Sequence, residues 1–424
     1  MLHEAGGFRM SNELDLVNIY SLLTPIAIVM IVIETVYVLF KKKEYISFFE
    51  AVTNMGTAIG NQCVNLGVAF LVVWSFGYVY EYRFFTIPTT FWNFCLLLVA
   101  FDFFFYWFHR HGHAINILWA AHMPHHSSEE FNLFVGVRAS ITQRLFSFTY
   151  LWPLALMGFR PEAIYAASAV QLMIALWHHT RVIKKMGWYE IIFNSPAYHR
   201  VHHAINDKYL DKNFGEIFII WDKMFGTYAK EEEEEEPIYG CLTPIQSCNP
   251  NKIYVQFWKA LFIDMVNTKS WWDKIRLWFM PLGWRPDDVK HIQRYRINEK
   301  TFVKYNVEVP TTKKAFLVLQ VALGLYLMSS TINLNIPFTM VERLSLIFSL
   351  WLMIMSWGKL LESEKSYAKF EGIRLFLTMM TMYFINQNHG TNKHLMISMV
   401  LIITTGLLQF VPMFKVMQPQ VAAE

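Results

Sequence analysis

Histidines crowd one part of this 424-residue chain, because eleven of the fifteen fall between His109 and His203. Eight of the eleven form three patterns with helical spacing, namely His109-x3-His113, His122-x2-His125-His126 and His199-x2-His202-His203. Residues three and four apart lie on one face of a helix, so each pattern points two or three imidazole rings the same way. Imidazole binds borderline transition metals readily, and two ions with four or five ligands each need about eight to ten nitrogens. The patterns therefore predict a centre of two metal ions.

The predicted ligand set extends beyond the three patterns. The pair His178-His179, at the end of an apolar run, could add one nitrogen, which we assign to His179. The predicted metal ligands are thus His109, His113, His122, His125, His126, His179, His199, His202 and His203. His111 points away from the face of His109, so it and His178 are treated as neighbours of the site. Four isolated histidines are expected to bind no metal, namely His3, His291, His389 and His394.

An acid precedes the first pattern on the same expected helix. Asp102 lies two turns before His109 on nearly the same face, and Tyr106 lies four residues after Asp102. An acid within a membrane span costs about 2.5–3.5 kcal/mol on insertion scales and usually faces the protein interior. We expect Asp102 to accept the N–H of a ligand histidine, with Tyr106 beside it. Pairing of Asp102 with Arg110 or with a neighbouring helix is the alternative.

The elements that must position these residues are membrane helices. Hydrophobic residues make up 54% of the chain, and charged residues only 17%. About 20 apolar residues span a bilayer, which predicts spans over Val17–Phe40, Val64–Tyr80 and Pro88–Phe108. Glu34 is a costly acid inside the first span. Lys41, Lys42 and Lys43 follow that span, so the positive-inside rule predicts that the histidine-rich segment faces the cytosol.

Further apolar runs follow the first two histidine patterns. Leu145–Met157 and Ala163–Trp177 are short for full spans, so they form either a thin or re-entrant helical hairpin or include a buried helix. Three or four more spans are expected from the runs Ala315–Met328, Leu344–Trp357, Leu375–Ile385 and Leu395–Phe414. The acidic run Glu231–Glu236 is interpreted as a solvated loop.

The predicted fold is all-α: a polytopic helical membrane protein with a histidine-rich di-metal unit on the cytosolic face. Its expected parts are N-terminal transmembrane segments over residues 1–87, a catalytic region over 88–230, a polar connector over 231–314 and C-terminal transmembrane helices over 315–424. The net charge of +4 argues against a nucleic-acid partner. The four cysteines form no CxxC pair and are too few for a disulfide framework.

The sequence between Pro88 and Tyr228 resembles the fatty acid hydroxylase and sterol desaturase superfamily. The three histidine patterns occur in that superfamily's order and are followed by Asp211-x-Asn213-Phe-Gly215 and by the segment 221–227, WDKMFGT. Within the superfamily the chain is most similar to the alkylglycerol monooxygenase family. That similarity rests on YWFHR at 106–110, HHSSE at 125–129 with Asn132, HTRVI at 179–183, SPAYHRVHH at 195–203 and the extra spans after the catalytic region.

This resemblance implies an activity and its cofactors. The family's enzymes use two iron ions, tetrahydrobiopterin and O2 to hydroxylate the ether-bearing carbon of an O-alkylglycerol, which then yields a fatty aldehyde and glycerol. By motif, the eight histidines of the three patterns would bind the iron, with His179 as a ninth ligand. Asp102, Tyr106 and Asn213 are expected to support these ligands. One departure from the pattern is Ala114, which stands where an acid is expected directly after the second histidine of the first pattern. That departure weakens the expectation of the pterin.

Two other functions stay open from the sequence. One is a sterol or fatty-acyl hydroxylase or desaturase with a cytochrome or ferredoxin as electron donor. The other is a zinc-binding membrane transport protein, although transport predicts ionisable residues in several spans rather than at one edge. The spacing suits zinc as well as iron. No Rossmann glycine pattern or CxxCH haem site occurs in the sequence, so electrons must come from a diffusible cofactor or a partner protein. An endoplasmic reticulum membrane and a bacterial inner membrane are both compatible locations.

Overall fold

The computed structural model describes residues 11–389 and 393–408, and its elements are helices. Within these two ranges no strand occurs, and only isolated bridges pair extended residues. Four helices in these ranges are long and apolar enough to cross a membrane: α2 (Phe48–Glu81), α3 (Phe91–Ala114), α12 (Thr311–Ile332) and α13 (Met340–Leu361). The predicted all-α, polytopic membrane fold is therefore confirmed.

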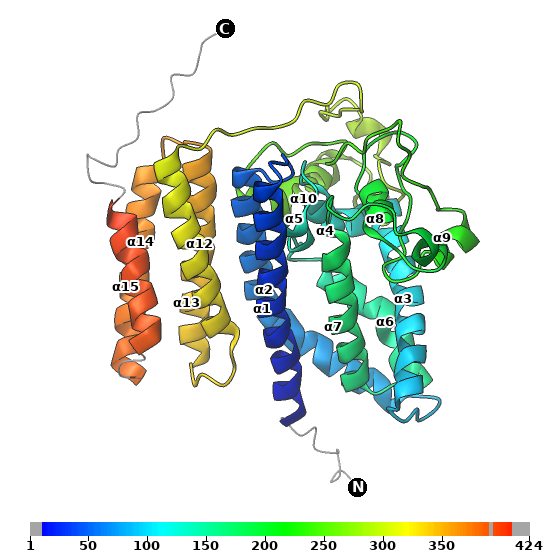
Figure 1. Ribbon diagram of the computed structural model, residues 1–424, viewed down its shortest axis with the longest axis horizontal. Helices are drawn as coiled ribbons and strands as arrows, with labels where there is room; N and C mark the ends of the chain where they lie inside the picture. Colours follow the sequence, from blue (N-terminus) through cyan, green and yellow to red (C-terminus); the bar gives the residue numbers. More distant parts are fainter. Residues whose placement is uncertain (1–10, 390–392, 409–424) are drawn as a thin grey trace.

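The long helices form two blocks that stand side by side (Figure 1). The first block contains α2 and α3 together with α1 (Ser11–Phe40), α6 (Arg144–Met157) and α7 (Pro161–His178). The second contains α12 and α13 with α14 (Tyr367–His389) and α15 (Lys393–Leu408). Shorter elements gather mainly at one end of the first block, namely α4 (Asn116–His126), α5 (Leu133–Gly136), η1 (Gly187–Ile191), α8 (Pro196–His202), α9 (Ile220–Phe225), α10 (Pro250–Asn267), α11 (Trp271–Arg276) and η2 (Asp287–Val289).

Helix α2 begins at Phe48 rather than at Val64, where its apolar run starts. Its first turns carry polar side chains that are nevertheless buried, among them Glu50, Asn54 and Asn61. A hydropathy pattern assigns such polar residues to a loop, because it cannot detect hydrogen-bond partners elsewhere in the chain. The polar half of α2 therefore lies inside the protein, beneath the short helices.

The two short apolar runs form a helical hairpin, α6 and α7, that packs against α3. The hairpin turns at Gly158, where φ is +107°, and an added Cβ atom would lie 2.1 Å from the carbonyl oxygen of Phe85. Only glycine fits this position without strain. Between α2, α3 and this hairpin lies a core that includes Phe76, Phe101 and Leu154.

The second block differs in part from the expectation of three or four spans. The run Leu375–Ile385 lies in α14, and Leu395–Phe414 begins in α15 but ends outside the described residues. Neither α14 nor α15 is among the described helices that are apolar and long enough to span. One reason is that α14 carries Glu371 and Arg374, which form a buried ion pair.

Candidate metal centre

The nine predicted ligands come together in two adjacent groups. The five-histidine group consists of His109, His113, His122, His126 and His202. The four-histidine group consists of His125, His179, His199 and His203. Within each group the candidate ligand nitrogens all lie within 4.8 Å of one another. Eight of the nine side chains are buried, and His125 is half-buried.

The Nε2 atoms point toward one another inside each group. In the five-histidine group, the Nε2 of His122 lies 3.1 Å from that of His109 and 2.9 Å from that of His126. In the four-histidine group, the Nε2 atoms of His179 and His203 are 3.2 Å apart. Two imidazoles bound to one ion at about 2.0–2.1 Å have nitrogens about 2.9–3.4 Å apart at octahedral or tetrahedral angles. The separations therefore fit rings that share a metal ion.

The opposite ring nitrogen, Nδ1, faces a protein oxygen in many of these histidines. A hydrogen bond from Nδ1–H to such an oxygen fixes the tautomer and leaves the Nε2 lone pair free for a metal. The backbone pairs, at 2.7–2.9 Å, are His109 with Phe214, His125 with Arg138, His179 with Ala175 and His202 with Lys212. In His122 the partner is the Oε1 atom of Gln143, at 3.0 Å. These bonds aim the rings inward.

Local sequence explains how the last histidine pattern is presented. Helix α8 begins after Ser195, whose side chain accepts a hydrogen bond from the N–H of Tyr198, and Pro196 occupies the first turn. Serine as the capping residue and proline directly after it both favour a helix start. His199 and His202 then lie on one face of a short helix. The Ser-Pro pair therefore sets the register of these two rings.

Neighbouring histidines serve different groups. His125 belongs to the four-histidine group and His126 to the five-histidine group, and His203 and His202 divide in the same way. Consecutive residues on a helix point about 100° apart, so two adjacent rings reach two different positions. The His126 and His203 rings stack with centroids 4.2 Å apart. These two stacked rings therefore form the boundary between the two groups.

Burial keeps the histidines of α4 and α8 neutral. Desolvation lowers the pKa of His122, His126 and His202 well below the ordinary value, and it lowers the pKa of His125 to about 4. The neutral ring is the form that binds metal, so at neutral pH few protons compete for these nitrogens.

Asp102 makes contacts other than the expected one. Its carboxylate accepts hydrogen bonds from the backbone N–H groups of Ile217 and Phe218 at 2.8 and 2.9 Å, and from the indole of Trp221 at 3.0 Å. The carbonyl that receives Nδ1 of His109 belongs to Phe214, in the same loop. In the described structure Asp102 therefore binds the loop that faces His109 and makes no direct hydrogen bond to a predicted ligand. Its side-chain partner is not Arg110 but Trp221 of the neighbouring helix α9, as the alternative expected in part.

Tyr106 and Asn213 also hold backbone segments in place. The Tyr106 hydroxyl hydrogen-bonds the Thr227 hydroxyl at 2.9 Å and accepts from Arg110 at 3.1 Å. The amide of Asn213 donates to the carbonyls of Tyr198, at 3.0 Å, and Ala229, at 2.8 Å. Tyr106 thus connects α3 to the segment after α9, and Asn213 connects the loop after α8 to α8 itself and to the segment after α9.

Asp222 is a loop anchor that sequence reasoning did not single out. Its carboxylate accepts from the N–H groups of Phe214 and Gly215, each at 2.8 Å, and from the Thr227 hydroxyl at 2.7 Å. An added Cβ atom at Gly215 would lie 2.2 Å from the Phe218 carbonyl oxygen. The segment 221–227, which supports the family resemblance, thus stabilises the loop at Phe214 and Gly215.

Two acids from the N-terminal helices reach the four-histidine group, and sequence reasoning assigned neither to the site. Glu34 in α1 accepts hydrogen bonds from the N–H of Leu133 and from the hydroxyl of Thr180, the residue after His179. Glu50 in α2 pairs with Arg138 at 3.3 Å, and the Arg138 carbonyl receives Nδ1 of His125. The one sequence signal for these contacts was Glu34, an acid inside the first predicted span.

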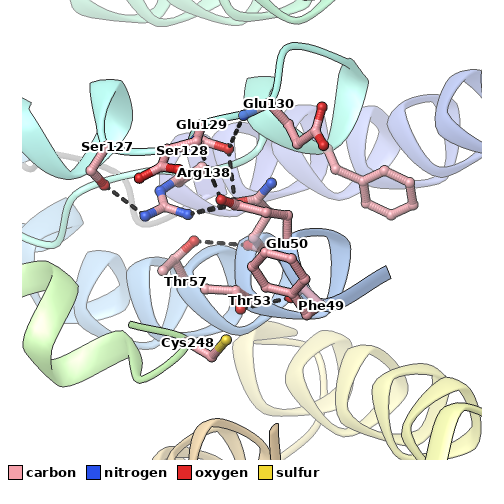
Figure 2. A network of polar contacts seen from close by, with 12 residues as sticks. Phe49, Glu50, Thr53, Thr57, Ser127, Ser128, Glu129, Glu130, Arg138 and Cys248 are labelled. Carbon is pink, nitrogen blue, oxygen red and sulfur yellow. Dashed lines mark hydrogen bonds and ion pairs between the residues drawn. The ribbon is translucent and has the colours of Figure 1, made fainter. Parts of the chain in front are cut away.

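Figure 2 shows the Arg138 guanidinium placed between Glu50 and Ser127. Arg138 donates to the Ser127 hydroxyl at 2.6 Å, to the Pro124 carbonyl at 2.8 Å and to Asn54 at 2.9 Å. These donors bind the end of α4 to the polar half of α2. The network therefore fixes the segment on which His125 lies.

Three other sequence interpretations can be compared with the structure. His111 belongs to neither group, and its Nδ1 lies 3.0 Å from the Tyr150 hydroxyl. The acidic run Glu231–Glu236 is not only a solvated loop, because Glu231 forms a bidentate ion pair with buried Arg200 at 2.6 and 2.7 Å. The four cysteines are free.

A third, smaller group lies against the four-histidine group. It consists of His178, Glu216 and His199, all buried. His178 Nδ1 lies 3.5 Å from Glu216 Oε1. Burial raises the pKa of Glu216 to about 8. The expectation that His178 merely neighbours the site therefore omitted this contact.

Comparisons with known proteins agree with the geometry. Residues 94–227 match the family model for fatty acid hydroxylases. The alkylglycerol monooxygenase of Homo sapiens is 32% identical over 340 residues, which are 78% of this chain and 75% of the relative. That of Danio rerio is 30% identical over 74% of this chain and 69% of the relative. An ornithine lipid hydroxylase of Rhizobium tropici is 32% identical over 31% of this chain and 40% of its own length. No solved structure matches the chain significantly.

The matched region contains both histidine groups, and the similarity to the alkylglycerol monooxygenases extends well beyond it into the membrane helices. The chain therefore belongs to the fatty acid hydroxylase family, in its alkylglycerol monooxygenase branch, and is an oxidoreductase that hydroxylates a lipid in a membrane.

Proposed function

We propose that this protein is a di-iron monooxygenase that hydroxylates the ether-bearing carbon of O-alkylglycerols, with O2 as oxidant and tetrahydrobiopterin as electron donor. The observation that carries the proposal is the pair of adjacent histidine groups, five and four rings, with Nε2 atoms turned inward. The names of the human and zebrafish relatives supply the substrate class.

The overall reaction balances with these reactants. One oxygen atom of O2 enters a C–H bond next to the ether oxygen, and the other leaves as water with two electrons from the pterin and two protons. The resulting hemiacetal breaks its C–O bond to give a fatty aldehyde and a free glycerol hydroxyl. Two iron ions, when bound by the nine histidines, would supply the activation of O2, a task that protein side chains cannot perform alone.

The chain's own contribution is placement of the ligands and of the lipid. Backbone carbonyls, such as those of Phe214 and Arg138, hold ligand rings in one tautomer. His109 and His113 lie in the last turns of α3, a helix able to span the membrane. A lipid anchored beside α3 has its head group at that depth. The ether-bearing carbon of the alkyl chain is bonded directly to the ether oxygen of the glycerol head group. It would then lie nearer the metal centre than the rest of the alkyl chain.

We also propose that the histidine groups face the cytosol. Lys41 and Lys43 follow α1, and Glu44 and Tyr45, just beyond them, contact Arg181 and Asn132 of the catalytic region. The basic end of α1 therefore lies at the same end of the molecule as the metal centre. By the positive-inside rule this end is cytosolic, in an endoplasmic reticulum membrane or a bacterial inner membrane. The catalytic region is proposed to span 88–230, between membrane segments over 1–87 and, after a connector, 315–424.

A second candidate is a sterol or fatty-acyl hydroxylase or desaturase fed by an electron-transfer protein. It is favoured by partial similarity to a sterol desaturase of Aspergillus fumigatus, 28% identical over 32% of this chain and 38% of the relative. Ala114, in the position where an acid is expected, also weakens the case for the pterin.

One assay separates the two candidates. Purified protein loaded with ferrous iron is incubated with an O-alkylglycerol under air, with tetrahydrobiopterin in one sample and a reduced ferredoxin or cytochrome in another. Fatty aldehyde formed only with the pterin is the expected result. Turnover of a sterol or acyl chain without pterin, and no aldehyde from the ether, would overturn the proposal.

A further inference from the structure

Buried polar atoms without partners are concentrated beside the four-histidine group. In the described part of the chain, both ring nitrogens of His178, Nδ1 of His199 and Oε1 of Glu216 are buried without a hydrogen bond of standard geometry, although His178 Nδ1 lies 3.5 Å from Glu216 Oε1 and the backbone of Asn194 interacts with the His178 ring. His178 is 0% exposed, His199 2% and Glu216 4%. Leaving such a group unpaired costs about 1–3 kcal/mol, and more where the group is charged. Nδ1 of His199 and the long contact between His178 and Glu216 leave hydrogen-bonding capacity that a bound species would satisfy.

His199 differs from His125 and His179 in the surroundings of its Nδ1 atom. In His125 and His179, Nδ1 faces a backbone carbonyl, which makes that nitrogen a donor. His199 also belongs to the group with His178 and Glu216, and its Nδ1 has no hydrogen-bond partner, while its Nε2 lies 3.1 Å from Nε2 of His179. Once its N–H proton is released to water, the His199 ring can therefore act as an imidazolate and present one nitrogen to each of two neighbouring centres.

The chemistry of the three side chains suits a divalent transition metal. Two imidazoles and one carboxylate form a common ligand set for zinc and for ferrous iron, and both metals use it with further positions open to water. The 3.5 Å between His178 Nδ1 and Glu216 Oε1 is close to the separation of about 3.4 Å for two ligands of a tetrahedral ion. A metal ion would displace the proton from the buried Glu216 carboxyl group and provide the positive charge that its ionised form needs.

We propose that His178, Glu216 and Nδ1 of His199 form an auxiliary site for one divalent zinc or iron ion, joined to the four-histidine group through the shared His199 ring. This inference rests on the two-ion centre proposed above and adds a third ion to it. The auxiliary ion would hold the His199 ring in position. The affinity of the auxiliary site for this ion would depend on whether the four-histidine group is occupied.

Metal stoichiometry tests the auxiliary site without an activity measurement. The full-length protein, purified in detergent, is saturated with zinc, desalted and analysed by elemental mass spectrometry. Three ions per chain are expected in the unmodified protein, and two in each of the variants Glu216→Gln and His178→Asn. The control His291→Ala changes an exposed histidine and should retain three. Size-exclusion profiles identify any variant that has not folded.

Zinc K-edge absorption gives a second measurement that does not depend on counting. The auxiliary ion has only two imidazole ligands, so it lowers the average number of imidazoles per zinc, which multiple scattering from the rings reports. Glu216→Gln, by removing this ion, should raise that average. Two ions in the unmodified protein and in both variants would overturn the auxiliary site while leaving the two-ion centre intact. Fewer than two ions in the unmodified protein would overturn the two-ion centre itself, and the auxiliary site with it.

Discussion

The carboxylate of Glu34, within α1, accepts a hydrogen bond from the hydroxyl of Thr180, the residue directly after His179. The same carboxylate accepts the N–H of Leu133 at 2.7 Å. An acid that is costly inside a hydrophobic helix thus joins two loops at the metal centre. The N-terminal block is therefore part of the site's support, although residues 94–227 alone match the family model.

Replacing Glu34 by Ala should loosen the turn that holds His179. Loss of a residue that supports a metal ligand typically costs about 10–100-fold in metal affinity or activity. We expect a loss of that size, and a smaller one for Glu34→Gln, which keeps an acceptor oxygen. Competition with a chelator measures the affinity, and Glu81→Ala, at the exposed end of α2, serves as the control. Equal affinities in all three variants would contradict this role.

His125→Ala should abolish turnover and lower the bound metal. His125 contributes to the four-histidine group, and its Nε2 lies 3.3 Å from that of His179. The matched change His291→Ala removes an exposed imidazole outside both groups and should alter neither quantity. Metal content and aldehyde formation measured on the same preparations check this prediction. If the two variants behave alike, the ligand assignment is wrong.

Arg138→Ala should destabilise the fold as well as the site. Arg138 and Glu50 are both buried, and removal of one partner of a buried ion pair commonly costs about 3–5 kcal/mol. The melting temperature in detergent should fall strongly, and metal affinity should fall with it, because the Arg138 carbonyl orients His125. Arg83→Ala, at an exposed turn, is expected to melt like the unmodified protein. A melting temperature unchanged by Arg138→Ala would argue against the network in Figure 2.

The pH dependence of the metal-free protein should report the depressed pKa of His125. Burial lowers this pKa to about 4 from 6.5, so below pH 6.5 the unfolded state binds more protons than the folded state. Stability attributable to this group is therefore lost as pH falls from 6.5 to 4, by about 1.4 kcal/mol per pH unit.

The variant His125→Gln isolates that contribution, because buried carboxylates with raised pKa, such as Glu216, titrate equally in both proteins and cancel. The gap in unfolding free energy between His125→Gln and the unmodified protein should shift in favour of the variant as pH falls from 6.5 to 4. Chemical denaturation at several pH values gives this gap. A gap that does not change with pH would show that His125 titrates normally.

Gly215→Ala should disrupt the loop that receives His109. The new methyl group would lie 2.2 Å from the Phe218 carbonyl oxygen and 2.9 Å from the Asp222 carboxylate, so the backbone must move. We expect poor folding yield and reduced metal content. Gly372→Ala meets open space within a helix and should be neutral or slightly stabilising. Comparable yields for both variants would mean that the loop adapts freely.

Local sequence was enough to predict much of the helical framework. The apolar runs placed α3, α12 and α13, since length and hydropathy are properties of one segment. The start of α2 was not predicted, because its polar residues are buried only through partners such as Arg138, which lies far along the chain. The contacts of Asp102 with the loop at Ile217 were missed for the same reason.

The sequence by itself determined which side chains could bind metal, because helical spacing turns the imidazoles of each pattern to one side. Only the tertiary structure decided how the nine divide, placing His125 in one group and His126 in the other. It also decided that Glu34 supports the turn after His179 and that Glu216 faces His178. These relations join residues widely separated in the chain, so they follow from packing of whole helices, which no local pattern encodes.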